Sequence, residues 1–140
     1  MSSAPKKPDF SGTWILNRQA CTLSPGADAM RSGSARIEHR DPTFRYEAAF
    51  ESDGGAVQTA YELLSDGREV VNEGDGMTIV SCLRWEGEAL IASWQIQRAD
   101  GEMAISFRHE LLDDGRRLRA VEVLRGSDRH QDNVWIFERG

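Results

Sequence analysis

Residues 77–112 read MTIVSCLRWEGEALIASWQIQRADGEMAISFRHELL, and this stretch decides the fold. It holds three runs in which apolar and polar side chains alternate, separated by Glu86-Gly87 and by Ala99-Asp100-Gly101. Alternation with a period of two indicates half-buried β-strands, and glycine after an acidic residue is typical of a tight hairpin. The stretch therefore predicts three consecutive antiparallel strands.

The same rhythm continues on both sides of this stretch. Further turn signals lie at 41–42, 53–55, 65–67, 74–76, 113–115 and 126–128. They predict nine strands between residues 35 and 138, and residues 12–17 supply a tenth. No gap is long enough for the helical crossovers that parallel strands need. We expect an all-β fold, a single antiparallel up-and-down β-barrel of about ten strands, because closure removes exposed sheet edges.

Two segments depart from the strand pattern. Residues 18–33 contain Ser24-Pro25, which resembles a helix N-cap with proline at the first helical position, and Gly33 is placed to end a helix. A short helical segment after the first strand is therefore predicted. Residues 1–9 carry two prolines and two lysines with almost nothing apolar. They predict a disordered N-terminal lead-in, which leaves residues 10–140 as the single barrel domain.

The composition excludes several classes of partner. The formal charge is 17 − 23 = −6, which argues against nucleic acid and against an anionic membrane surface, since both favour a basic face. No apolar run approaches the roughly 18 residues of a membrane span, and no secretory signal is visible at the start. Cys21 and Cys82 are too few for a disulfide scaffold, so reduced thiols and a cytoplasmic location are expected.

The first predicted strand carries a motif. The residues Phe10-Ser-Gly-Thr-Trp-Ile-Leu-Asn17 form a Phe-x-Gly-x-Trp-x-Leu pattern. This pattern resembles the calycin superfamily of lipocalins and fatty-acid-binding proteins, and small bacterial lipocalin-like proteins within it. The resemblance implies that Gly12 permits a close backbone approach and that Trp14 plugs the closed end of the barrel. It also implies that Arg139, at the end of the last strand, covers the tryptophan ring.

The barrel lumen is the expected site of function. Small barrels either fill their interior with side chains or hold one small ligand. The mainly apolar strand faces point a set of aromatic, methionine and histidine side chains inward: Tyr46, Tyr61, Met77, Trp94, Met103, Phe107 and His109. Aromatic and methionine side chains offer adaptable contact area. The sequence therefore predicts a ligand-binding protein for a small apolar or aromatic molecule, without a cofactor.

An enzymatic alternative rests on one hairpin. Glu122 interrupts the apolar face of Leu118, Ala120 and Leu124, and an ionisable group on a buried face needs a partner. A hairpin at 113–115 would pair His109 with a position between 119 and 122. A His109–Glu122 pair would be an acid/base dyad for isomerase, cyclase or hydratase chemistry, with the carboxylate raising the pKa of the imidazole. If the opposite face points inward, both side chains lie in solvent instead.

Two further alternatives remain open. His39, His109 and His130 are isolated in sequence, so no metal site is predicted, although a haem held by one histidine is a third candidate function. The last strand is apolar on both faces, with Trp135 and Phe137 on one side and Val134 and Ile136 on the other. We expect this second face to be covered by the amino-terminal segment or by a homodimer contact.

Overall fold

Ten antiparallel strands make up most of the chain, which is represented by a computed structural model describing residues 7–126 and 129–140. Residues 1–6 of the lead-in predicted at 1–9, and Ser127-Asp128 of the last predicted turn, lie outside the described residues. The strands are β1 (Gly12–Leu16), β2 (Met30–Arg40), β3 (Thr43–Ser52), β4 (Gly55–Leu64), β5 (Val70–Gly74), β6 (Met77–Glu86), β7 (Ala89–Arg98), β8 (Gly101–Leu112), β9 (Arg117–Gly126) and β10 (His130–Arg139).

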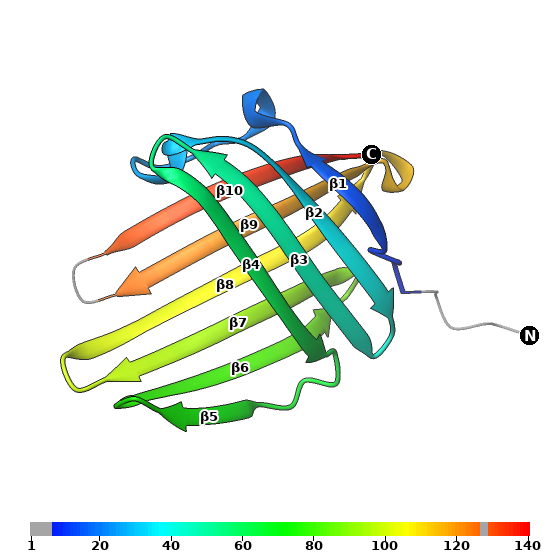
Figure 1. Cartoon of the computed structure of the whole chain (residues 1–140). Helices are drawn as coiled ribbons and strands as arrows, with labels where there is room; N and C mark the ends of the chain where they lie inside the picture. Colours follow the sequence, from blue (N-terminus) through cyan, green and yellow to red (C-terminus); the bar gives the residue numbers. More distant parts are fainter. Residues whose placement is uncertain (1–6, 127–128) are drawn as a thin grey trace, which may run out of the picture.

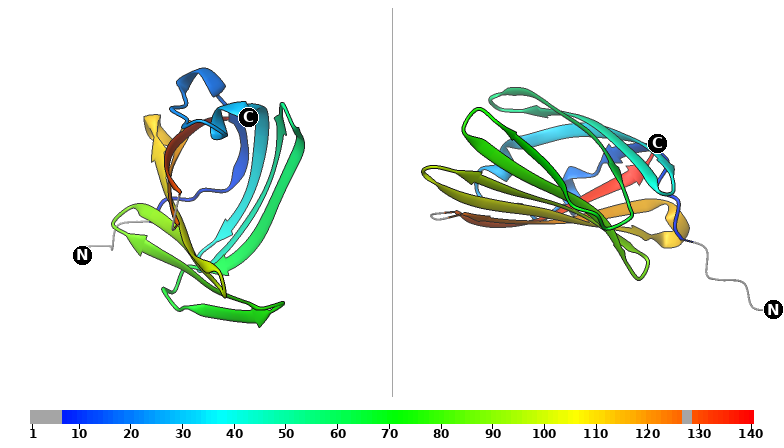
Figure 2. Two further views of the ribbon diagram at one scale, coloured as in Figure 1. Left: turned by 90° about the vertical axis from the view of Figure 1, so that its left-hand side faces the viewer. Right: turned by 90° about the horizontal axis from the view of Figure 1, so that it is seen from below.

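The strands follow one another around a single sheet. Their order is β4-β3-β2-β1-β10-β9-β8-β7-β6-β5, so β1 pairs with β10 and every other pair is consecutive in the chain. Residues 17–29 join β1 to β2, and the other consecutive pairs are joined by shorter turns. Figure 1 shows β1–β4 crossing over the strands of the second half, and Figure 2 shows the sheet curling round on itself. Among the described residues no ladder joins β4 to β5, so one seam is left without main-chain pairing. The predicted all-β, up-and-down architecture is confirmed.

The turn chemistry explains the sharpness of the hairpins. Asp75 and Gly76, between β5 and β6, have φ angles of 53° and 70°. Positive φ at both central residues is the geometry that matches the twist of paired strands, and it favours Asp-Gly. The acidic-glycine pairs thus set the strand boundaries that the sequence predicts.

The predicted helix after the first strand is much reduced. The structure has two three-residue 3-10 turns there, η1 (Arg18–Ala20) and η2 (Ala27–Ala29), and β2 already begins at Met30. Gly33 does not end a helix, because it lies inside β2, where a Cβ would collide with the ring of Phe50. A third turn, η3 (Asp113–Gly115), joins β8 to β9. None of the described helical turns is long and apolar enough to cross a membrane.

One end of the barrel is sealed by the motif residues. Trp14 is fully buried, and its Nε1 donates to the carbonyl of Phe10 at 3.0 Å. The guanidinium carbon of Arg139 lies 4.3 Å from the centre of the indole ring, and the two residues are paired between β1 and β10. A Cβ on Gly12 would collide with Nη1 of Arg139. The buried tryptophan and its basic cover, which the resemblance implies, are confirmed. The group that approaches Gly12 is the Arg139 side chain rather than a backbone segment.

The second apolar face of β10 is covered within the chain. Ile136 is 7% exposed, and its backbone N–H donates to Sγ of Cys21 at 3.3 Å. The N–H of Asn17 donates to the carbonyl of Ile136, and Thr22 forms an antiparallel bridge with Val134. These bonds place residues 17–22 along the edge of β10, in the plane of the sheet, and Ile136 is buried without a second copy of the chain.

Candidate functional site

Beyond the sealed end, side chains do not fill the barrel. A cavity of about 410 Å³ lies between the two halves of the sheet. Its walls are mainly apolar and aromatic and come from β2–β4 and β7–β10. The lining residues are Met30, Tyr46, Phe50, Val57, Thr59, Ala60, Tyr61, Trp94, Ile105, Phe107, His109, Leu118, Ala120, Glu122, Trp135 and Phe137.

Aromatic rings from four strands form a continuous wall of this cavity. Tyr46 of β3 and Tyr61 of β4 stack with ring centres 5.0 Å apart, and Tyr61 meets Trp94 of β7 edge to face at 4.9 Å. Trp94 in turn contacts Phe107 of β8 at 6.2 Å. Tyr46 and Tyr61 lie directly opposite each other in the β3–β4 ladder, and Trp94 and Phe107 are diagonal neighbours on β7 and β8. Tyr61 and Trp94 meet although β4 and β7 are not paired in the sheet. Such aromatic pairs favour stacked or edge-to-face geometry.

The structure separates the two methionines from the other predicted ligand-binding residues. Tyr46, Tyr61, Trp94, Phe107 and His109 all line the cavity. Met77 and Met103 do not, because each lies near the start of its strand, close to a hairpin, opposite Arg98 and Gly126 respectively. The alternation identified their face correctly but carried no information on how far along the strands the cavity extends.

Both cavity tyrosines are held in the protonated state. Burial raises the pKa of Tyr46 well above its usual range, and the negative charge of Glu122 raises it further. Burial raises the pKa of Tyr61 as well, with a smaller contribution from Tyr46. Near neutral pH each hydroxyl therefore retains its proton and can both donate and accept a hydrogen bond.

His109 is a neutral side chain at the boundary between the sealed end and the cavity. It is 3% exposed, and burial lowers its pKa to about 4, although the hydrogen bond to the Leu90 carbonyl acts in the opposite direction. Nδ1 lies 3.1 Å from that carbonyl oxygen, which can only accept, so Nδ1 carries the proton and Nε2 is left as an acceptor. The rings of Phe44 and Phe107 pack against the imidazole with centres 5.9 and 6.2 Å away.

Glu122 is held in place by the neighbouring strand. Its Oε1 accepts hydrogen bonds from Nε1 of Trp135 at 2.9 Å and from Nδ2 of Asn133 at 3.1 Å. Asn133 is 2% exposed, and its Oδ1 accepts from the backbone N–H and the hydroxyl of Ser24 at 2.7 and 2.9 Å. Ser24 thereby fixes the orientation of the Asn133 amide, and that amide helps to hold the Glu122 carboxylate in place.

The predicted His109–Glu122 dyad does not form. In the β8–β9 ladder His109 lies opposite Ala120, and Glu122 lies opposite Phe107. Each ionisable group is committed to another partner, and the pKa of the imidazole is lowered by burial rather than raised by a carboxylate. The predicted contact and the predicted direction of this shift are both wrong, although both side chains line the cavity.

The inward face of β9 is nevertheless the predicted one. Leu118, Ala120 and Glu122 line the cavity. The arginines of β9 point outward and form ion pairs with carboxylates on the outer surface: Arg117 with Glu138, Arg119 with Glu110, and Arg125 with Asp132.

Sequence reasoning did not find the roles of Asn133 and Trp135. The alternation of β10 marks Trp135 only as an apolar side chain and assigns Asn133 no role. A buried indole and a buried amide each need hydrogen-bond partners. The signal that could have found them is their place on the strand next to β9, since Asn133 lies directly opposite Glu122 in the β9–β10 ladder.

The described residues bring no group of three His, Cys, Asp or Glu side chains together in a way that could hold a metal ion. The three histidines are far from equivalent. His39 is buried at the sealed end, His109 borders the cavity, and His130 is exposed at the start of β10.

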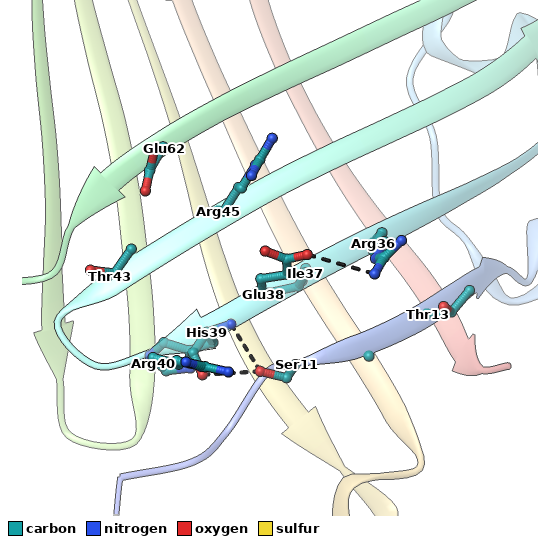
Figure 3. A pocket seen from close by; sticks show the side chains of 11 residues that line it. Ser11, Thr13, Arg36, Ile37, Glu38, His39, Arg40, Thr43, Arg45 and Glu62 are labelled. Atoms are coloured by element: carbon teal, nitrogen blue, oxygen red, sulfur yellow. Dashed lines mark hydrogen bonds and ion pairs between the residues drawn. The ribbon is translucent and has the colours of Figure 1, made fainter.

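A second hollow lies on the outer wall of β1–β4, shown in Figure 3. Charged side chains border it, and several pair with one another along the surface, as Arg36 does with Glu38 at 3.6 Å. At the edge of this hollow the Ser11 hydroxyl donates to the backbone carbonyl of His39 and accepts from the backbone N–H of the same residue. The hollow is open to solvent and its charged side chains are largely exposed, so the interior cavity is the better candidate for a ligand site.

No family model matches this chain, and no curated protein matches it. Solved structures resemble it over nearly the whole length. Zebrafish ileal bile acid-binding protein complexed with cholic acid has a TM-score of 0.61 at 14% identity, covering 94% of this chain and 98% of the other. Human cRBP IV gives 0.57 at 15% identity, covering 95% and 99%. A secretory abundant heat soluble protein from Ramazzottius varieornatus gives 0.60 at 9% identity, covering 93% and 94%. At these identities the likeness shows the fold, which is the calycin-like barrel expected from the residues around Trp14.

Proposed function

We propose that this protein binds one small, mainly apolar molecule in the cavity. The observation that carries the proposal is a space of about 410 Å³ with a wall of aromatic rings from four strands. Sites for small ligands typically measure about 300–1,000 Å³ and combine apolar walls with a few polar groups. The similar zebrafish barrel was solved with cholic acid, which supports a small apolar ligand without identifying it for this chain.

Several contacts favour a pre-formed site over a cavity left by loose packing. The tyrosine, tryptophan and phenylalanine rings pack against one another rather than collapsing into the space. The few polar groups that face it are anchored from behind, Glu122 by Trp135 and Asn133, and His109 by Leu90. A rigid wall with fixed polar groups reduces the entropy that binding must overcome.

The test is a variant that narrows the cavity. Ala120 is 5% exposed and lines the cavity, so Ala120→Phe places a ring in the ligand space. Calorimetric titration with 1-naphthylmethanol, a neutral aromatic probe, should show binding to the parent protein and a loss of affinity of about tenfold or more in the variant. Ala49→Phe, on the exposed outer face of β3, is the matched control and should bind as the parent does. Equal binding by Ala120→Phe, with an unchanged circular dichroism spectrum, would contradict the proposal.

A further inference from the structure

The charge that the described side chains bring to the cavity is negative. Among the described residues that line it, Glu122 is the only charged side chain. The arginines nearest along β9, Arg119 and Arg125, lie on the outer surface, where each pairs with a carboxylate at 3.0 and 2.8 Å respectively. Glu122 is half-buried between mainly apolar walls, and a carboxylate in such a place is solvated less well than one on the outer surface.

Only one of the two oxygens of the Glu122 carboxylate accepts hydrogen bonds from described protein groups. Both hydrogen bonds to Glu122 end on Oε1, from Asn133 and Trp135, and both donors are neutral. Within residues 7–126 and 129–140, no protein group donates to Oε2. The carboxylate is thus positioned by one oxygen and has the other available, in a cavity that supplies no cation.

The groups near Glu122 also present electron-rich atoms to the cavity. His109 donates through Nδ1 to Leu90 and therefore carries an acceptor at Nε2. The rings of Tyr46, Tyr61 and Trp94 are packed together, and the faces of such rings carry partial negative charge that attracts cations. A carboxylate, an imidazole lone pair and aromatic faces are complementary to a positive group and repel a negative one.

We propose that the ligand is an organic cation, a protonated amine on an apolar or aromatic body, and that Oε2 of Glu122 receives its N–H. The inference rests on the proposed function, since it specifies the chemistry of the molecule bound in the same cavity. The apolar body contacts the aromatic wall, while the ammonium group forms a charge-assisted hydrogen bond with the carboxylate. Anionic amphiphiles are disfavoured because their charge would lie near that of Glu122 with no cation to offset it.

The experiment compares three probes that share one ring system. Calorimetric titrations at pH 7 use 1-naphthylmethylamine, which is cationic, 1-naphthylmethanol, which is neutral, and 1-naphthaleneacetate, which is anionic. The amine should bind about tenfold or more tightly than the alcohol, and the acetate more weakly than the alcohol. Because the naphthyl body is constant, the order of affinities reports the charge preference of the cavity.

Glu122→Gln tests whether this carboxylate is the cause. The substitution keeps the shape and an oxygen for Asn133 and Trp135 but removes the charge. It should reduce amine affinity by about tenfold and leave alcohol affinity within about twofold. Glu102→Gln, on an exposed position of β8, removes the same charge away from the cavity and should change neither affinity.

The outcomes are distinguishable. If the alcohol binds but the amine has no advantage, or if Glu122→Gln keeps that advantage, the cation proposal is overturned while the proposed function stands. If the acetate binds most tightly, the cation proposal is likewise overturned. If none of the three probes binds the parent protein, both proposals are overturned. The probe series on the parent protein decides the matter even if Glu122→Gln does not fold.

Discussion

The two ends of the barrel are built from the same strands but packed in opposite ways. At the sealed end Phe10, Trp14 and Phe44 have no exposed surface. Burial then decreases along the strands, as in β7, where Ala89–Ala92 is buried throughout and the following residues are increasingly exposed. Past the middle lies the cavity, and beyond it Val57 on its rim is 39% exposed. The contrast teaches that side-chain packing is concentrated at one end of the barrel, which leaves the cavity at the other.

Hydrogen bonding follows the same division. At the sealed end polar groups satisfy each other: Oδ1 of Asp41 accepts from the hydroxyl of Ser65 at 2.6 Å and from Nε1 of Trp85 at 2.9 Å. Nδ1 of His39 accepts from the N–H of Phe10. In the cavity, Glu122 retains an oxygen to which no described group donates. Polar groups that complete one another stabilise a fold, whereas incompletely paired groups are available to a ligand.

The largest expected effect comes from comparing two tryptophans. Trp14→Ala removes a fully buried indole from the sealed end and should reduce the free energy of unfolding by about 3–5 kcal/mol. Trp94→Ala, at the cavity wall, removes a half-buried indole and should cost only about 1–2 kcal/mol. Urea denaturation followed by circular dichroism measures both. Equal losses of unfolding free energy in the two variants would show that both ends contribute alike to stability, contrary to the difference in packing.

The boundary residue His109 gives the next largest effect, through pH. Its folded pKa of about 4 lies below the ordinary value of 6.5, because burial disfavours the charged imidazole. Between these values the unfolded chain binds a proton that the folded chain does not, so stability is complete above about pH 6.5 and is lost as the pH falls towards 4. The loss over that window should be about 3 kcal/mol.

Urea denaturation of the parent, His109→Gln and His130→Gln across pH 4–7 isolates this contribution. His109→Gln should have a shallower pH dependence than the parent. His130→Gln, which changes an exposed histidine on β10, should retain the slope of the parent. If His109→Gln kept the slope too, the imidazole would not be buried in its neutral form.

A smaller effect is expected from the Asp41 cluster. Partial burial opposes ionisation of Asp41, but hydrogen bonds from Ser65, Trp85 and His39 outweigh it and lower the pKa of the carboxyl. A depressed pKa contributes stability above the unfolded value, near pH 4, which is lost as the pH falls through the folded value. Because the side chain is 45% exposed, Asp41→Asn should cost only about 1 kcal/mol at pH 7.

The stability difference between the parent and Asp41→Asn should shrink as the pH falls below about 4. Glu88→Gln, at the exposed β6–β7 turn, is the control and should have the stability of the parent at both pH values. A difference between parent and Asp41→Asn that persisted unchanged at low pH would mean that the charge of Asp41 has no part in the cluster.

The two ends also differ in how far the sequence predicts them. The sealed end depends on a local motif, Gly12 and Trp14, and on a period of two, so its strands and its Arg139 cover could be anticipated. The cavity depends on register. The hairpin at 113–115 predicts a partner for His109 anywhere between 119 and 122, and that range includes both the observed Ala120 and the proposed Glu122. The partners of Glu122 come from β10, whose alignment is fixed by its pairing with β9 and β1, which no local pattern specifies.

The last prediction contrasts one arginine from each end. Arg139 lies over the Trp14 ring, and it donates from Nη1 to the Ser11 carbonyl at 2.8 Å and from Nε to the Gly115 carbonyl at 2.9 Å. Arg139→Ala removes the cation–π contact and both hydrogen bonds and should cost about 1 kcal/mol, less than Trp14→Ala because the guanidinium borders solvent. Arg139→Lys keeps the charge but not the planar donor fork, so its stability should be intermediate between those of the parent and Arg139→Ala.

At the cavity end of the barrel, Arg31 donates two hydrogen bonds of 2.9 Å to Asp53, but both side chains are largely exposed. Water competes for an exposed pair, so Arg31→Ala should leave the urea midpoint unchanged within error. If Arg31→Ala proved as destabilising as Arg139→Ala, the location of an arginine along the barrel would not determine its contribution, and the sealed end would lose its special place in the stability of the fold.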